Sequence, residues 1–243
     1  MAGSGAKAGK PARVGKQAGE ARAARAARTA SARAQPRKRT KDKLAERRAA
    51  RREAILAAAL DEFAERGFEG ARLDDVARRA GIAKGTIYLY FADKESLFQE
   101  LIRSALSPFV ATIEAAHSID LPLRVVCDRL AGAFAREVLG TRRKDIVRLM
   151  ISEGRRFPKI AKFYYEEVPR RAFAAVRALV QKGIERGEIE DDTLEKFPQL
   201  IIAPVLVAIV WDGLFDKYEP LDAEGLMRAH FHLVFKAIER RTP

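Results

Sequence analysis

The stretch that most constrains the fold lies at residues 68–98 and reads FEGARLDDVARRAGIAKGTIYLYFADKESLF. Its two short helical runs flank Gly81, and they can share one small core only if they cross at a steep angle. The crossing needs a small residue on the earlier run, which is Ala77, and the turn needs a residue that tolerates positive φ, which is Gly81. Ile82 and Ile87 are spaced to fill the space between the runs. This pattern predicts a helix-turn-helix.

Apolar residues elsewhere recur at three- and four-residue spacing, and no sustained period-two alternation is found, so the sequence predicts an all-α protein. A long fourth helix is expected to begin after Asp93, a good N-cap, with Pro108 inside it as a kink or a break. The expected helices are one ending at Gly67, 73–80, one from Gly81 to near Phe91, one from Lys94 towards His117, 122–139, 143–155, 159–187, 193–216 and 222–240.

The helix after Gly81 is expected to be a recognition helix that lies in the major groove of duplex DNA. Because Gly85 has no side chain, the backbone can come close to the DNA there. Two positions on a helix are about 200° apart, so only one of Tyr88 and Tyr90 can face the DNA while the other packs. The candidate DNA-contacting residues on and after this helix are Lys84, Gly85, Thr86, Tyr88, Tyr90 and Lys94, and one of the two tyrosines is expected to pack instead.

Residues 48–98 resemble the N-terminal domain of the TetR/AcrR family of regulators, and AGIAKGTIYLYFADKESLF is the most diagnostic stretch. The resemblance implies three DNA-binding helices, a larger helical domain with a ligand pocket, and a homodimer that binds an operator. Two positions depart from the family pattern. Arg72 and Ala83 stand where the family usually has a capping hydroxyl residue, so a phosphate contact is in doubt at Ala83, whereas Arg72 can replace it by charge.

The positive charge is concentrated at the N-terminus. Residues 1–43 contain thirteen basic and two acidic residues, a net charge of +11, whereas the whole chain carries +13. Such a segment cannot bury enough apolar surface to become ordered by itself. We therefore expect a disordered basic tail at 1–45, a DNA-binding domain at 46–95 and a helical ligand-binding and dimerisation domain at 96–243. The tail either makes the protein more soluble or results from a start codon assigned too far upstream. The alternative is an arm that contacts DNA.

The domain at 96–243 has two predicted functions, and the sequence is less informative there. Aromatic and polar residues between its helices are expected to line a pocket for a small-molecule effector of unknown identity. The candidate pocket residues are Phe109, Phe134, Met150, Glu153, Phe157, Tyr164 and Tyr165. The last two helices are apolar on more than one side, which is typical of a two-fold four-helix interface. The candidate dimer residues are Ile201, Val205, Ala208, Trp211, Phe215, Leu226, Leu233 and Ala237.

Several other classes of protein are disfavoured. Cys127 is alone, so no intrachain disulfide is possible and a reducing, cytoplasmic setting is expected, although the Arg-rich start also resembles an organellar transit peptide. The longest apolar run is too short to cross a membrane. His230 and His232 face different directions on a helix, so neither a metal site, a cofactor nor an enzyme is expected. A DNA-binding protein without an effector, held mainly by its basic tail, remains the alternative.

Overall fold

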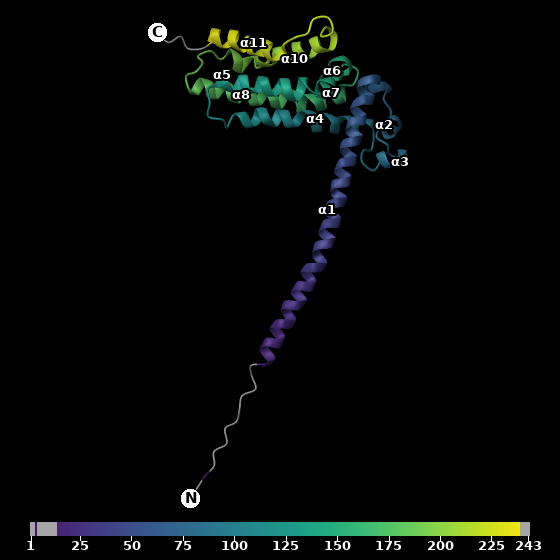
Figure 1. The fold of residues 1–243 in the computed structure, drawn as a ribbon. Helices are drawn as coiled ribbons and strands as arrows, with labels where there is room; N and C mark the ends of the chain where they lie inside the picture. The colour runs from purple at the N-terminus through teal and green to yellow at the C-terminus, as the bar shows by residue number, and fades with distance from the viewer. Residues whose placement is uncertain (1–2, 4–13, 239–243) are drawn as a thin grey trace. The chain divides into compact units, whose positions relative to one another are not determined.

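The computed structural model of the chain describes Gly3 and residues 14–238 (Figure 1). The chain divides into two compact units, Met1–Glu53 and Ala54–Pro243. The first unit contains the N-terminal part of α1 (Val14–Gly70), so residues 14–45 are helical where a disordered tail was expected. Ala, Arg and Lys dominate this segment and have high helix propensities, which accounts for the difference. The rest of that predicted tail, apart from Gly3, lies outside the described residues.

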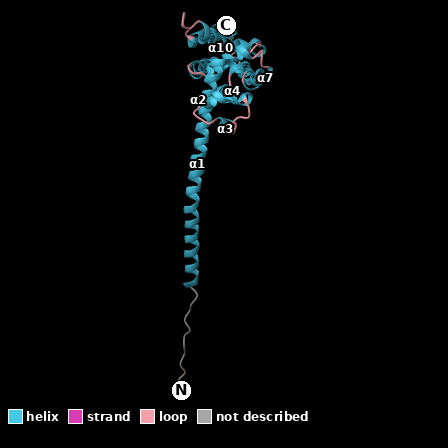
Figure 2. Cartoon of the chain, turned by 90° about the vertical axis from the view of Figure 1, so that its right-hand side faces the viewer, coloured by secondary structure: helices cyan, strands magenta, loops and turns pink. Residues whose placement is uncertain are grey.

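The second unit is built from helices, and no strand is formed between residues 54 and 238, as predicted for an all-α protein (Figure 2). Gly67 has φ +68°, and its backbone leaves the helical region where the first helix was predicted to end. The helices that follow are α2 (Leu73–Arg79), α3 (Lys84–Ile87), α4 (Lys94–Ala116), α5 (Leu123–Phe134), the π-helical turn η1 (Ala135–Leu139), α6 (Arg143–Glu153), α7 (Pro158–Glu167), α8 (Pro169–Glu185), α9 (Thr193–Lys196), α10 (Gln199–Leu214) and α11 (Ala223–Ile238).

Prolines decide where the structure differs from the predicted helix boundaries. The predicted helix 159–187 is two helices, because Pro169 begins α8 directly after Val168. The predicted helix 193–216 is likewise divided, by Pro198, into α9 and α10. A proline in a helix interior removes one backbone hydrogen bond. Pro108 nevertheless lies inside α4, which continues without a break to Ala116.

One hydrophobic core extends through the second unit, from Ile55 of α1 to Phe235 of α11. The helix α4 packs against α7 and α8, while α11 packs against α5 and α10. The largest completely buried side chains include Phe63, Phe98 and Phe235. The helix-turn-helix therefore shares its core with the C-terminal helices through α4.

Candidate nucleic-acid interface

The turn between α2 and α3 has the geometry that the sequence predicted. Ala77 is only 1% exposed, and Gly81 has φ +65°, a conformation that favours glycine. The amide of Ile82 donates a hydrogen bond of 3.0 Å to the carbonyl of Ala77, which closes the turn after α2. Ile87 is fully buried beneath the turn. The two short helices thus cross over a small residue and are held by the core below them.

Three phenylalanines anchor this reading head, by which we mean residues 54–98. The ring of Phe63 lies 4.9 Å from that of Phe98 in an edge-on contact and 5.7 Å from that of Phe68. Phe68 and Phe98 are 5.4 Å apart, so all three rings touch. Aromatic pairs in such geometries add stability beyond the burial of their area. The cluster joins the end of α1 to the start of α4.

A buried carboxylate fixes α2 against α1. Glu62 is completely buried, and its Oε2 atom accepts a hydrogen bond of 2.9 Å from Nε of Arg79. Arg66 approaches the other oxygen of Glu62 at 3.1 Å, and Arg79 also pairs with Glu65. Because a buried charge is costly unless it is paired, this network favours one orientation of α2.

The recognition segment is shorter than predicted but exposes the expected surface. α3 spans only Lys84–Ile87, and turns continue to Tyr90 through hydrogen bonds from Leu89 to Thr86 and from Tyr90 to Ile87. Lys84 and Gly85 are exposed, and Thr86 is half-buried. Bonds between residues three apart tighten the end of a helix, which explains the early end of α3.

The two tyrosines have different surroundings, as their spacing predicts. Tyr88 is 49% exposed, whereas Tyr90 packs partly against the hydrophobic core. Phe91, which follows Tyr90, is buried in the core. Leu89, which the sequence analysis did not single out, is 81% exposed beside Tyr88. An exposed leucine next to polar reading residues can contact a thymine methyl group.

The cations of the reading head differ in what they contact. The Nζ atom of Lys84 donates to Oδ2 of Asp74 at 2.7 Å, and this hydrogen bond raises the pKa of the lysine. Arg72 is exposed at the N-cap of α2, and neither it nor Ala83 provides a side-chain cap. The missing caps agree with the two departures found in the sequence.

Lys94 points towards the junction with the C-terminal helices. Its Nζ atom donates to the carbonyl of Glu69 at 2.9 Å and lies 4.8 Å from the centre of the Phe68 ring. Burial lowers the pKa of Lys94, and the charges of Glu69 and Glu153 oppose that shift. In this conformation the ammonium is held by protein atoms, so a phosphate contact requires it to move.

Two family profiles match the sequence of this chain. The profile described as "Bacterial regulatory proteins, tetR family" matches residues 55–101, and that described as "Tetracyclin repressor-like, C-terminal domain" matches residues 124–225. The chain belongs to the tetR family of bacterial regulatory proteins. Its members are transcriptional regulators and not enzymes.

Curated relatives agree with this family. The Escherichia coli regulator RutR is 29% identical over 119 residues, which cover 49% of this chain and 48% of RutR. The chain therefore spans about half the length of RutR. The Escherichia coli regulator UidR is 29% identical over 179 residues, which cover 72% of this chain and 83% of UidR.

Solved structures share the fold of this tetR-family chain. A family regulator from Mesorhizobium loti superposes with a TM-score of 0.65 at 21% identity, covering 79% of this chain and 98% of its own. The regulator FadR from Bacillus subtilis, solved in complex with stearoyl-CoA, gives a TM-score of 0.65 at 20% identity and covers 77% of this chain and 99% of its own. These similarities show the three-dimensional fold.

The seven candidate pocket residues have different surroundings in the structure. Phe109 and Phe134 are in contact, with ring centres 5.7 Å apart, and Phe134 directly precedes η1. Burial raises the pKa of Tyr164 to about 12, whereas Tyr165 is 52% exposed and lies at the surface. Tyr165 therefore lies at the surface, and its place in a ligand pocket stays a prediction.

Glu153 and Phe157 lie instead at the junction with the reading head. Phe157 packs edge-on against Phe68 at 4.7 Å. A Cβ atom added to Gly67 would lie 3.0 Å from Oε1 of Glu153, and Oε2 of Glu153 is buried without a hydrogen bond. Arg156 pairs with Glu69 across the same junction. The end of α6 therefore packs directly on α1 at the non-helical residue Gly67.

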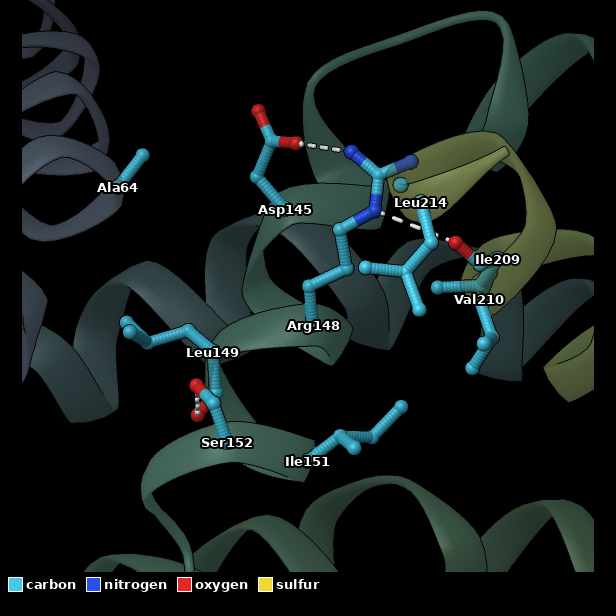
Figure 3. A pocket seen from close by; sticks show the side chains of 10 residues that line it. Ala64, Asp145, Arg148, Leu149, Ile151, Ser152, Ile209, Val210 and Leu214 are labelled. Carbon is cyan, nitrogen blue, oxygen red and sulfur yellow. Dashed lines mark hydrogen bonds and ion pairs between the residues drawn. The ribbon is translucent and has the colours of Figure 1, made fainter. Parts of the chain in front are cut away.

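A groove of about 430 Å³ opens between Ala64 of α1, α6 and α10 (Figure 3). Arg148 lines it, donates to Oδ1 of Asp145 at 3.0 Å and to the carbonyl of Ile209 at 3.2 Å, and pairs with Asp212. None of the seven candidate pocket residues lines this groove. The arginine is already held by protein atoms, so the groove offers mainly apolar walls.

The dimer candidates on α10 differ in their exposure. Ala208 is buried, whereas Ile201 and Val205 pack partly against the core and stay partly exposed. The side chains that α10 exposes are Leu200, Leu206, Val207, Val210 and Leu214. Because α10 is apolar on every side, periodicity could not show which side the chain itself covers.

The remaining dimer candidates are divided between the core and the surface. Phe215 and Leu233 are exposed, as is Ala237, whereas Leu226 is half-buried. Trp211 is half-buried, and its Nε1 atom donates to the carbonyl of Glu219 at 2.7 Å. Leu233 is therefore exposed on α11, as several large apolar side chains are on α10.

Other chemistry is not supported by the described residues. Cys127 is buried, and burial raises the pKa of its thiol to about 12, so the thiolate is scarce at neutral pH. Between residues 14 and 238, no three His, Cys, Asp or Glu side chains are grouped to hold a metal ion. Among the same residues, no helix has the length and apolar character that a bilayer crossing requires.

Proposed function

We propose that this chain is a sequence-specific, DNA-binding transcriptional repressor that leaves its operator when a small molecule binds to its C-terminal helices. It would act in the cytoplasm as a homodimer. The observation that carries the proposal is the exposed surface of Lys84, Gly85, Tyr88 and Leu89 on a short segment fixed by a buried core. A rigid element with exposed polar groups is what entry into a major groove requires.

Some residues of the reading head would contact phosphates and others would contact bases. Arg72 and Lys84 supply charge for phosphates, which set the position of the protein on the duplex. Gly85 leaves open space, because a Cβ atom added there meets nothing within 4 Å. Gly85 is therefore not required for packing within the chain, but it allows the DNA to come close to the backbone. The pair between Lys84 and Asp74 is exposed to solvent and contributes little to stability, so a phosphate can displace it.

A homodimer would cover the exposed apolar face of α10 and α11. Leu206, Val207 and Leu233 are each about half exposed or more, and Val210 is 38% exposed. Large exposed apolar surfaces often mark an interface with another protein. Pairing this face about a two-fold axis would bury these side chains and fix the distance between two reading heads. Dimers of this kind read half-sites about 34 Å apart.

An effector would bind among the C-terminal helices near Phe109, Phe134, Met150 and Tyr164. The π-helical turn η1 begins directly after Phe134, and such turns are frequent at functional sites. FadR from Bacillus subtilis was solved with stearoyl-CoA. A long-chain acyl thioester is therefore a reasonable first effector to test, together with the free fatty acid.

Lys94 and Glu153 offer a route from effector to DNA. Lys94 is held at the junction by Glu69 in this conformation, and the charge of Glu153 favours its ammonium there. A phosphate would compete for the same group. An effector that moves α4 or α6 would change this competition, provided that it binds the two states with different affinities.

The proposal is tested by selecting genomic DNA fragments with the purified protein and measuring affinity for the selected operator. Tyr88→Ala should weaken operator binding at least about 10-fold, the size expected for loss of one good contact. Tyr218→Ala is the matched control, since this tyrosine is 76% exposed outside the reading head. Wild-type affinity in Tyr88→Ala would contradict the assignment of the reading surface.

The alternative function is an architectural DNA-binding protein without an effector, and the charge of +11 on residues 1–43 is the observation that favours it. Such a protein would bind operator and scrambled duplex equally and would lose affinity steeply with salt. A clear preference for the operator would exclude this alternative.

A further inference from the structure

The part of α1 between residues 42 and 53 carries its opposite charges on opposite sides. At about 100° per residue, its five basic residues occupy an arc of about 180°, and its three acidic residues lie within about 40° on the other side. The basic face consists of Lys43, Arg47, Arg48, Arg51 and Arg52, and the acidic face consists of Asp42, Glu46 and Glu53. All eight side chains are exposed.

This arrangement is unfavourable for a helix by itself. Lys43, Arg47 and Arg51 follow one another at four-residue spacing, and like charges at that spacing destabilise a helix by about 0.2–0.5 kcal/mol per pair. Within the described part of the chain, no ion pair is formed by these three residues. Alternating charges would have avoided the repulsion, so the basic face suits an external polyanion.

Duplex DNA is the polyanion that fits this face. The cations at positions 43, 47 and 51 repeat about every 6 Å along the helix axis. A duplex carries one negative charge per about 1.7 Å of its own axis, so phosphates are available to every cation. An anionic bilayer would in addition need a broad apolar face, and Leu44 is the one large apolar residue between positions 42 and 53.

We infer that residues 43–52 form a second DNA-contacting element that binds phosphates without reading sequence. This inference rests on the proposed function, which supplies duplex DNA as the partner. Base readout would remain with the recognition segment, and the basic face would add affinity for any duplex. The element would contact phosphate oxygens, whereas the reading head would also contact base edges. Phosphate contacts carry no direct sequence information.

The test compares two triple variants of the full chain. Lys43→Ala, Arg47→Ala and Arg51→Ala remove the basic ladder, and alanine keeps the helix propensity high. Arg129→Ala, Lys159→Ala and Lys162→Ala remove the same charge from exposed sites on α5 and α7. Affinity is measured by fluorescence anisotropy for a scrambled 30-base-pair duplex (about three helical turns) and for the selected operator, over a series of salt concentrations.

The ladder variant should lose affinity for both duplexes by the same factor, at least about 10-fold at low salt. Its salt slope should fall by about 2–3, because each lost phosphate contact removes about 0.9. The control variant should change the slope by less than about 1. Equal slopes in the ladder variant and the wild type would overturn the inference, as would a loss confined to the operator.

Two further measurements test the proposed function and the identity of the polyanion independently of each other. If the wild type binds operator and scrambled duplex equally, the proposed function fails, but the ladder variant can still be compared on the scrambled duplex. Vesicles of phosphatidylglycerol provide the second measurement. A ladder-dependent binding to vesicles with unchanged duplex binding would overturn the assignment of DNA as the partner.

Discussion

The helices around the recognition turn and the last two helices of the chain are both rich in apolar residues, but they expose different kinds of side chain. In the reading head, the phenylalanines at 63, 68 and 98 are buried and the surface is made by residues such as Lys84 and Tyr88. In α10, large apolar side chains such as Leu206 and Leu214 are themselves exposed. The first region is complete within one chain, whereas the second has apolar surface that a partner can cover.

This difference indicates where the free energy of each region comes from. The reading head is stabilised by its own buried side chains. Its exposed residues are therefore not needed for stability and are available to contact DNA. The exposed face of α10 gains stability only when something removes it from water. Four experiments test this difference.

The largest effect is expected for Phe63→Ala. Phe63 is completely buried between Phe68 and Phe98, and removing a buried phenylalanine costs about 3–5 kcal/mol of unfolding free energy. Denaturant titration followed by circular dichroism measures the loss. Leu89→Ala is the control, because Leu89 is 81% exposed and its removal should change stability by less than about 0.5 kcal/mol.

The next effect concerns association and not folding. Leu206→Asp with Val210→Asp places two charges on the exposed face of α10, which should raise the dimer dissociation constant at least about 100-fold, or about 2.7 kcal/mol. Sedimentation equilibrium measures the constant, and circular dichroism should show an unchanged helix content. An unaltered dimer would mean that the chain associates through another surface.

Two glycines of the recognition turn should respond in opposite ways. Gly81→Ala forces an L-residue to positive φ and should cost about 1–2 kcal/mol of stability. Gly85→Ala lies in α3 with open space around it, so stability should stay the same or rise, while affinity for DNA falls. Thermal unfolding and anisotropy with the operator separate the two. A destabilised Gly85→Ala would show that this glycine serves the fold.

The smallest effect is expected for Glu153→Gln. The substitution keeps the shape of the side chain but removes the charge that favours Lys94 at the junction. Operator affinity should rise by up to about 5-fold, corresponding to about 1 kcal/mol or less. Lys94→Ala should abolish the effect of Glu153→Gln. If Glu153→Gln changes affinity equally with and without Lys94, the proposed competition is wrong.

The fold class and the core of the recognition turn could be predicted from the amino-acid sequence alone. Ala77 and Gly81 satisfy requirements that are local, a close crossing and a positive φ, and local requirements can be read from residue type and spacing. The choice of helix over strand also follows from periodicity alone, and the all-α prediction is confirmed.

Which side of an apolar helix the chain covers, and where long side chains point, depend on tertiary packing and could not be predicted from the sequence. Ala208 and Val207 are neighbours of similar character, and the packing of α10 against α6 and α11 buries one and exposes the other. The spacing of Tyr88 and Tyr90 predicted that only one of them could face the DNA, and the packing of the chain exposes Tyr88 and partly buries Tyr90. Lys94 could reach either a phosphate or Glu69, because a flexible cation takes its partner from elements that are distant in the sequence.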